Sequence, residues 1–298
     1  MPLVFAKSKM DREHVMAKKE IGCDGIEYQM LASDFNGARE LISPEMCLSV
    51  VEEHPAHAIH LPMNDCNVED DIGAVLEYVV QLAEHSALIW ASMGKDVEPI
   101  VVLHNEQHFS SMDGSKRTEI EVMLDSMLGA YPHVQFAVEN TTPFRWLQKM
   151  STRLSSGYFD SPVMLVEYLR RVLATDRIGT CLDTCHAKIT ERTMRAVTDL
   201  CPEANLTLSM EGYFEKYLPT CKLLHFASYE GSGYGAGHAT PYTKEKQEEL
   251  EEEVGLYRRL GYECPITLEI NEKDLLVCDG YAQSKKNLQR AWKKANDR

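Results

Sequence analysis

Hydrophobic residues in this chain occur in short apolar runs separated by longer segments of helical periodicity. The short runs predict eight strands: Leu3–Ala6, Gly25–Gln29, Ala58–Leu61, Ile100–His104, Val134–Glu139, Gly179–Asp183, Lys222–Ala227 and Ile266–Ile270. The longer segments predict helices: Asp11–Ile21, Asp71–Trp90, Ser115–Leu128, Ser161–Leu173, Lys244–Leu260 and Ala282–Lys294. Strands that alternate with helices are typical of a parallel sheet built from βα units. Eight such units predict a (β/α)8 TIM barrel, with residues 1–298 as a single domain.

Local signals support several of these elements. Asp11 is suited to cap the first helix, and Pro162 stands at the first helical position after Ser161. The stretch 187–220 is longer than one helix, so we expect it to hold additional structure. The acidic run Glu248–Glu253 is interpreted as the solvated face of a helix.

Histidine or acidic residues end most of the predicted strands. They are His60, His104, Glu139, Asp183, His225 and Glu269. Such groups are costly inside an apolar strand unless they leave it at an end or are held by a metal. In a TIM barrel the carboxyl ends of the strands form the active-site mouth. The pattern therefore predicts a metalloenzyme whose ligands converge at that mouth.

Glu139, Asp183, His225 and Glu269 are the predicted metal ligands. Three carboxylates and one imidazole suit Mn²⁺, Mg²⁺, Co²⁺ or Zn²⁺, and the sequence does not choose among them. Each acid taken alone is equally consistent with a strand-end cap or a salt bridge. Four such residues in strand order favour a metal site.

Other polar residues near the strand ends are candidates for substrate or additional metal binding. His186 follows Asp183 and is open to a second metal, to donation to a substrate oxygen, or to a plain loop position. His60 and His104 fit metal ligation and a hydrogen-bonded place in the pocket wall equally well. Glu27 ends the second strand and is expected at the pocket floor or behind a ligand.

The segment 228–243 contains four glycines and follows the seventh strand. Glycine permits close backbone approach to a ligand, so this segment is a candidate cover for the mouth that places His238, Tyr234 or Glu230 on substrate. A surface loop without catalytic duty is the alternative. Arg145 and Lys188 are candidate cations for a substrate phosphate, with a solvent-facing role as the alternative for each.

Composition narrows the class of protein further. The formal net charge of −15 disfavours broad binding of a nucleic-acid backbone, which usually needs a basic stripe. The nine cysteines show no paired framework and favour free thiols in a reducing compartment. Mean hydropathy is −0.31 and no long uncharged apolar run predicts a membrane span. No secretory signal is visible either, so we expect a cytoplasmic protein.

The motifs resemble those of the xylose-isomerase-like TIM-barrel superfamily, over essentially the whole barrel. The most specific piece is Cys181-Leu182-Asp183-Thr184-Cys185-His186-Ala187, followed by Val138-Glu139-Asn140-Thr141 and Leu268-Glu269. The superfamily contains sugar isomerases and epimerases, inosose dehydratases and the type IV AP endonucleases. The resemblance implies that Glu139, Asp183, His225 and Glu269 are the central metal ligands of both branches, and barrels of this type often form homo-oligomers.

The resemblance to the three-zinc endonucleases is incomplete. His60, His104, His186 and His238 match four of their additional ligands. Ala236, however, replaces the aspartate expected two residues before His238, and Phe226-Ala227-Ser228-Tyr229 replaces their Asn-Asp-Ser-Lys run. No arginine-bearing loop suited to entering a duplex follows the second strand. These departures and the net charge favour a small sugar-like substrate.

The leading hypothesis is a metal-dependent isomerase or epimerase of a small sugar, keto-sugar or polyol, which acts through an enediolate. Glu139 and Glu269 are its expected base and acid, and His186 is expected to steady a substrate oxygen. His60, His104, His238, Glu27, Arg145 and Tyr234 are the candidate substrate-binding residues. A zinc phosphodiesterase of the AP endonuclease type, a sugar or cyclitol lyase or dehydratase, and a non-catalytic binding barrel are the alternatives.

Overall fold

The computed structural model describes most of the chain. The described residues are 1–36, 38, 40–62, 68–104, 114–141, 162–197, 209–230, 237–261, 263–272 and 276–296, and the side chains of 68–72, 114–120, 193–197 and 237–238 are left out. Arg145 and Tyr234 therefore lie outside the described residues, and His238 is described only as backbone.

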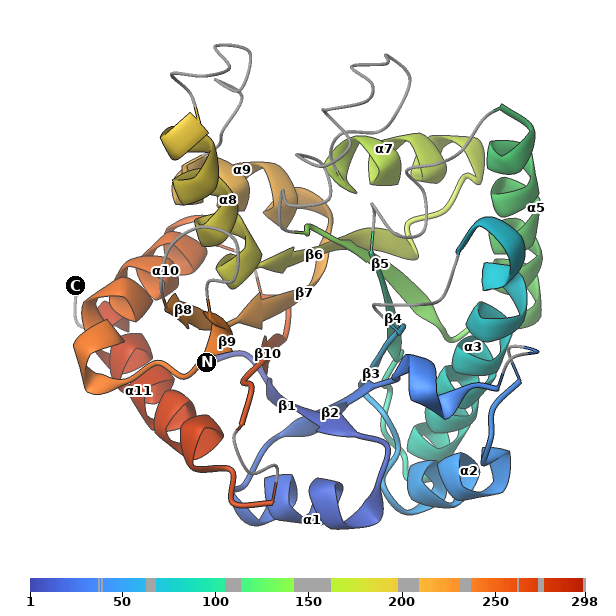
Figure 1. Cartoon of the computed structure of the whole chain (residues 1–298), viewed down its shortest axis with the longest axis horizontal. Coiled ribbons are helices and arrows are strands. Elements are labelled where there is room, and N and C mark those ends of the chain that lie inside the picture. Colours follow the sequence, from blue (N-terminus) through green and yellow to red (C-terminus); the bar gives the residue numbers. More distant parts are fainter. Residues whose placement is uncertain are drawn as a thin grey trace.

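Eight parallel strands close into a barrel (Figure 1). They are β1 (Val4–Lys9), β2 (Gly25–Gln29), β3 (Ala58–His60), β4 (Ile100–His104), β5 (Gln135–Glu139), β6 (Ile178–Asp183), β7 (Cys221–Phe226) and β10 (Ile266–Leu268). The order around the barrel is β1-β10-β7-β6-β5-β4-β3-β2. Each strand thus pairs with its sequence neighbours in the barrel, and β10 closes the ring on β1 through the pairing of Val4 with Ile266. The predicted (β/α)8 fold is confirmed.

Helices surround the barrel in Figure 1. They are α1 (Arg12–Glu20), α2 (Pro44–Glu53), α3 (Val68–Ser92), α5 (Gly114–Ala130), α7 (Pro162–Val172), α8 (Thr184–Val197), α9 (Met210–Tyr217), α10 (Gln247–Arg259) and α11 (Asp279–Asn296). The six predicted helices are present with shifted ends. The stretch 187–220 holds most of α8 and all of α9, and α2 is a helix that the sequence analysis missed.

The predicted end signals act as expected. The Asp11 side chain accepts hydrogen bonds from the backbone amides of Glu13 and His14 and so caps α1. Pro162 is the first residue of α7. The segment after β7 is not only a loop: β8 (Ser228–Glu230) and β9 (Gly237–Thr240) pair as an antiparallel hairpin.

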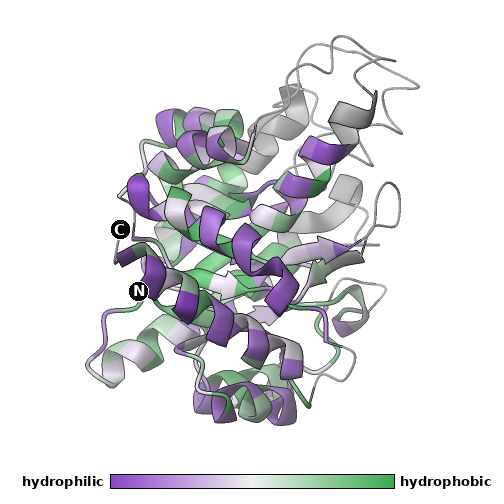
Figure 2. Ribbon diagram, turned by 90° about the vertical axis from the view of Figure 1, so that its left-hand side faces the viewer, coloured by the Kyte–Doolittle hydropathy of each residue, from purple (hydrophilic) through white to green (hydrophobic). Residues whose placement is uncertain are grey.

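Apolar side chains fill two regions. One lies between the strands and the helices. In Figure 2 the strands are largely green (hydrophobic), whereas purple (hydrophilic) residues are frequent on the helices. The other lies inside the barrel and consists of Phe5, Ala58, Ile100, Val102, Ala137, Cys181 and Leu223. No helix among the described residues is long and apolar enough to cross a membrane.

Candidate metal centre and active site

The polar site residues form the next layer above the apolar filling of the barrel. Strand side chains alternate between faces, so a residue two positions further along points the same way. Six residues of the filling are followed at that spacing by a polar residue; the followers are Lys7, His60, His104, Glu139, Asp183 and His225. Thr267 is likewise buried and precedes Glu269 by two positions. The period-two pattern therefore delivers the charged groups to the carboxyl ends of the strands.

The four predicted metal ligands come together. One ligand atom from each of Glu139, Asp183, His225 and Glu269 lies within 4.8 Å of all the others. All four residues are at most 5% exposed. A second group, His60, His104 and Glu139, meets the same distance limit. The two groups share Glu139.

Glu139 joins the two groups because its oxygens face different histidines. Oε1 lies 2.8 Å from Nδ1 of His225. Oε2 lies 3.0 Å from Nε2 of His60 and 2.7 Å from Nε2 of His104. Burial alone raises the pKa of the Glu139 carboxyl, but His225 and His104 outweigh it and hold the pKa well below its ordinary value. Glu139 is therefore an ionised carboxylate at the centre of the site.

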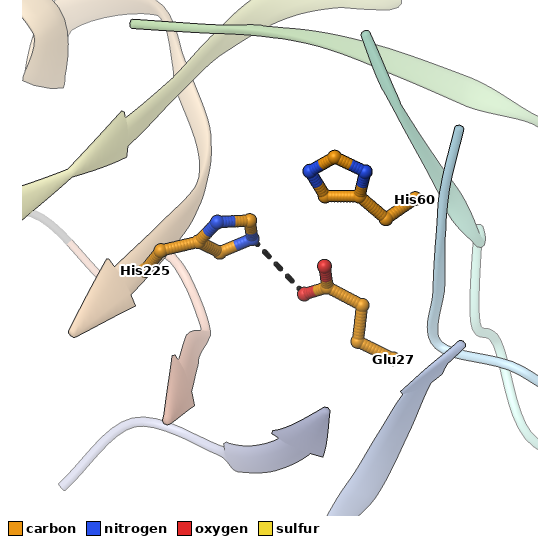
Figure 3. A group of neighbouring side chains, drawn as sticks. All are labelled: Glu27, His60 and His225. Atoms are coloured by element: carbon orange, nitrogen blue, oxygen red, sulfur yellow. Dashed lines mark hydrogen bonds and ion pairs between the residues drawn. The ribbon is translucent and has the colours of Figure 1, made fainter. Parts of the chain in front are cut away.

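Glu27 fixes the orientation of His225 from below. Figure 3 shows the Glu27 carboxylate beside the rings of His225 and His60, with Oε2 in contact with the His225 ring. This oxygen lies 3.0 Å from Nε2 of His225 and accepts a 2.6 Å hydrogen bond from the Thr267 hydroxyl. Since Nε2 donates to Glu27, the neutral ring of His225 has its lone pair on Nδ1.

The arrangement around Nδ1 of His225 fits a bound cation. Oε1 of Glu139 and Oε2 of Glu269 each lie 2.8 Å from this nitrogen. Oε2 of Glu269 accepts no hydrogen bond of good geometry from the described residues. In the tautomer set by Glu27, three buried acceptors face one another, which is unfavourable unless a proton or a metal ion lies among them. In the metal-free protein a proton on Nδ1 of His225 lies among these acceptors. Burial lowers the pKa of His225, but Cys181 and the carboxylates of Glu27, Glu139 and Glu269 raise it well above its ordinary value.

Asn140, the residue that follows β5, holds Asp183 and His186 in place through hydrogen bonds. The Asn140 side chain accepts from the Asp183 amide at 2.7 Å and donates to the Asp183 carbonyl at 2.9 Å. The Asp183 carboxylate accepts a 2.6 Å bond from the backbone amide of His186. Nδ1 of His186 lies 2.7 Å from the Asn140 carbonyl and donates to it, so Nε2 is the basic nitrogen of this ring. His186 belongs to the first turn of α8, which excludes the plain loop position.

Lys7 is a site residue that the sequence analysis missed. Its Nζ lies 2.6 Å from Oε1 of Glu269, and the two side chains are 11% and 7% exposed. The predicted first strand ended at Ala6, whereas β1 continues to Lys9. Alternation from the apolar Phe5 is the signal that places Lys7 inside the barrel.

Lys188 does not have either role considered for it. It is 8% exposed, and its Nζ lies 2.6 Å from carboxylate oxygens of both Glu249 and Glu253. The interpretation of Glu248–Glu253 as a solvated face is accordingly wrong for Glu253, which is 2% exposed because Lys188 and Tyr242 pair with it. The ammonium group of Lys188 therefore pairs with the carboxylates of α10.

Fold and site together define a (β/α)8 TIM barrel with a buried cluster of candidate metal ligands at the carboxyl ends of its strands, and solved structures share this fold. The chain is similar to an IolI protein with a bound zinc atom, with a TM-score of 0.54, 12% identity and 99% coverage of both chains. It is also similar to a 3-keto-D-glucoside 4-epimerase from E. coli, with a TM-score of 0.53, 11% identity and coverage of 97% of this chain and 100% of that one.

A third similar structure is a D-allulose 3-epimerase from Methylomonas sp. in complex with D-allulose. Its TM-score is 0.51 at 12% identity, with 99% of this chain and 96% of that chain covered. No protein-family model and no curated protein matches the sequence. At such low identity the similarity concerns the fold, and the activity has to be argued from the site.

Proposed function

We propose that this protein is a divalent-metal-dependent isomerase or epimerase of a small sugar, keto-sugar or polyol. The observation that carries the proposal is the meeting of Glu139, Asp183, His225 and Glu269 within 4.8 Å, with buried acceptors turned toward one another. Hard oxygen donors with one imidazole suit Mn²⁺, Mg²⁺, Co²⁺ or Zn²⁺. Two similar structures are epimerases of sugar-like compounds, and another has a bound zinc atom, which supports this class of reaction.

Glu139, Asp183, His225 and Glu269 would hold the metal ion, which would supply Lewis-acid polarisation of substrate carbonyl and hydroxyl oxygens and so make the adjoining C–H more acidic. Glu139 and Glu269 are the proposed base and acid, since both reach the site from different strands, β5 and the end of β10. Each is buried, which keeps water away from the transferred proton. His186 is proposed to hold a substrate oxygen.

The deciding variant is Glu269→Gln, which keeps the size of the side chain and removes its basic oxygen. We expect turnover of the responsive keto-sugar to fall by about 10³-fold or more, with an unchanged circular dichroism spectrum. Glu251→Gln on the outer helix α10 is the matched control and should retain activity. Near-normal turnover by Glu269→Gln rejects the assignment.

The site also motivates a second candidate function, a zinc phosphodiesterase of the AP endonuclease type. Its support is the group His60, His104 and Glu139, which shares Glu139 with the first group and would hold a further ion. Elemental analysis of protein purified without chelator or affinity metal separates the two. One ion per chain supports the isomerase, whereas two or three zinc ions favour the nuclease and require an assay on abasic duplex DNA.

A lyase or dehydratase acting on an oxidised sugar or cyclitol uses the same residues and the same first step. Product analysis distinguishes it, because elimination releases water and creates a new unsaturated or dicarbonyl product, whereas isomerisation conserves the mass of the substrate. A mass spectrum of the product mixture therefore tests the alternative on the same sample.

A further inference from the structure

Lys7 stands within an unusually acidic part of the barrel. Among the described residues it is the only lysine or arginine in ion-pair contact with the carboxylates of the site, through Oε1 of Glu269. Glu27, Glu139 and Glu269 all act on it electrostatically. Glu27 is also its partner in the pairing of β1 with β2. Among the residues that the structure describes, the site therefore contains one lysine, whose charge the proposed mechanism does not use.

The charge of Lys7 affects how strongly the site attracts a divalent ion. The carboxylates of Glu27, Glu139, Asp183 and Glu269 bring four negative charges into a buried region. Lys7 cancels one of these charges before any metal binds. An ammonium so close to the ligand set repels a second cation, and burial strengthens that repulsion because water screens it poorly.

The ion pair with Lys7 also determines which carboxylate oxygen of Glu269 faces the other candidate metal ligands. Oε1 is taken by Lys7 at 2.6 Å, and Oε2 is the oxygen that lies 2.8 Å from Nδ1 of His225. A carboxylate held in this way offers one oxygen to the ligand group instead of two. The second lone pair of Oε1 stays available to a substrate proton, and the plane of the carboxylate is fixed.

We propose that Lys7 is a positioning residue that holds Glu269 with one oxygen toward the metal and one toward the substrate, at the expense of metal affinity. The proposal rests on the function proposed above for the site, but its effect on metal binding is measurable without a substrate. This role also explains why the positively charged Lys7 lies among groups that are suited to binding a metal cation.

The test compares Lys7→Met and Lys7→Gln with Lys9→Met. Lys9 is exposed and lies two residues further along the same strand, so it points the same way as Lys7 but one layer nearer the opening, and its variant removes a charge from β1 while the Lys7–Glu269 ion pair stays in place. Co²⁺ is the probe, because its affinity is obtained by titration and its visible spectrum reports the number and arrangement of ligands. Turnover of the responsive sugar by the loaded protein is the second readout.

We expect Lys7→Met to bind Co²⁺ about tenfold more tightly than the unaltered protein, because the repelling charge is lost. Its Co²⁺ spectrum should change as Glu269 gains freedom to offer both oxygens, and kcat should fall about 100-fold with KM nearly unchanged. Lys7→Gln should bind Co²⁺ as tightly but retain more turnover, because its amide still donates to Glu269. Lys9→Met should behave as the unaltered protein in all three measurements.

Three results overturn the proposal. In the first, Lys7→Met and Lys7→Gln bind Co²⁺ more weakly, which indicates that Lys7 only supports the local structure. In the second, the Co²⁺ spectrum and affinity do not change. In the third, Lys9→Met produces the same shifts. If Lys7→Met does not fold, Lys7→Gln decides the outcome. If the unaltered protein turns over no sugar, the proposed function fails, but the Co²⁺ measurements still test the role of Lys7.

Discussion

At the scale of single residues, the sequence predicted which side chains meet but not how they contact one another. Strand ends identified Glu139, Asp183, His225 and Glu269 because parallel strands deliver their last residues to the same mouth. The contact between Glu27 and Nε2 of His225 joins residues 198 positions apart, and no local pattern encodes it. Lys7 was missed because the apolar run ends at Ala6, although the strand itself continues.

Glu27 is expected to tune metal binding through His225. The negative charge of Glu27 orients His225 and makes its Nδ1 a better electron-pair donor to a metal ion. Glu27→Gln removes this charge, so metal affinity should fall about 10- to 100-fold. Competition with a coloured chelator measures this change. Thr267→Val is the control: it removes the hydroxyl that donates to Glu27 at 2.6 Å but leaves the carboxylate in place, and its effect should be clearly smaller. Equal affinities for Glu27→Gln and the unaltered protein contradict the assigned role.

At the scale of elements, periodicity predicted the strands and most helices, because burial on one face imposes a spacing of two or of 3.6 residues. The helix α2 was missed even though Pro44 marks its first position. Periodicity also failed for α10, where the acidic run was assigned to solvent. Glu253 is buried because Lys188 reaches it from α8, and this pairing between distant helices is a tertiary effect.

Lys188 is expected to contribute strongly to stability by pairing α8 with α10. Its ammonium lies 2.6 Å from both Glu249 and Glu253, and it donates to the Ala227 carbonyl at 2.8 Å. Lys188→Met leaves the Glu253 carboxylate buried without its cation, which should lower the free energy of unfolding by about 3–5 kcal/mol.

Urea denaturation of Lys188→Met and Lys246→Met tests this prediction. Lys246 also pairs with Glu249, at 3.4 Å, but its side chain is 32% exposed. Water screens that pair, so Lys246→Met should cost no more than about 1 kcal/mol. Similar denaturation midpoints for the two variants mean that burial of the Lys188 group does not matter as argued.

At the scale of the whole molecule, eight strands with alternating helices were enough to predict the barrel, since a chain of parallel strands must close or leave exposed edges. Closure brings β10 next to β1 and so places Glu269 beside Lys7, residues from opposite ends of the chain. The acid-rich mouth is then a property of the closed barrel. The stability of the barrel should therefore depend on the ion that neutralises the acidic groups at this mouth.

Removal of metal is therefore expected to destabilise the fold, and more so at higher pH. In the metal-free protein the pKa of His225 is raised, because the surrounding carboxylates outweigh burial. A raised pKa contributes stability that is complete below the ordinary value of about 6.5 and is lost as pH rises through the raised value. Metal binding has the opposite dependence, since Nδ1 must lose its proton to become a ligand.

Calorimetry of metal-loaded and chelator-treated protein between about pH 6 and about pH 9 measures the combined effect. A metal at 100 times its Kd adds about 2.7 kcal/mol to the stability of the folded state, which corresponds to a rise in Tm of about 4 °C for a chain of this length. We expect this difference in Tm to widen as pH increases, because the proton that replaces the metal at His225 is lost. A difference that is constant over this range shows that His225 does not exchange a proton for the metal, and it removes His225 from the proposed ligand set.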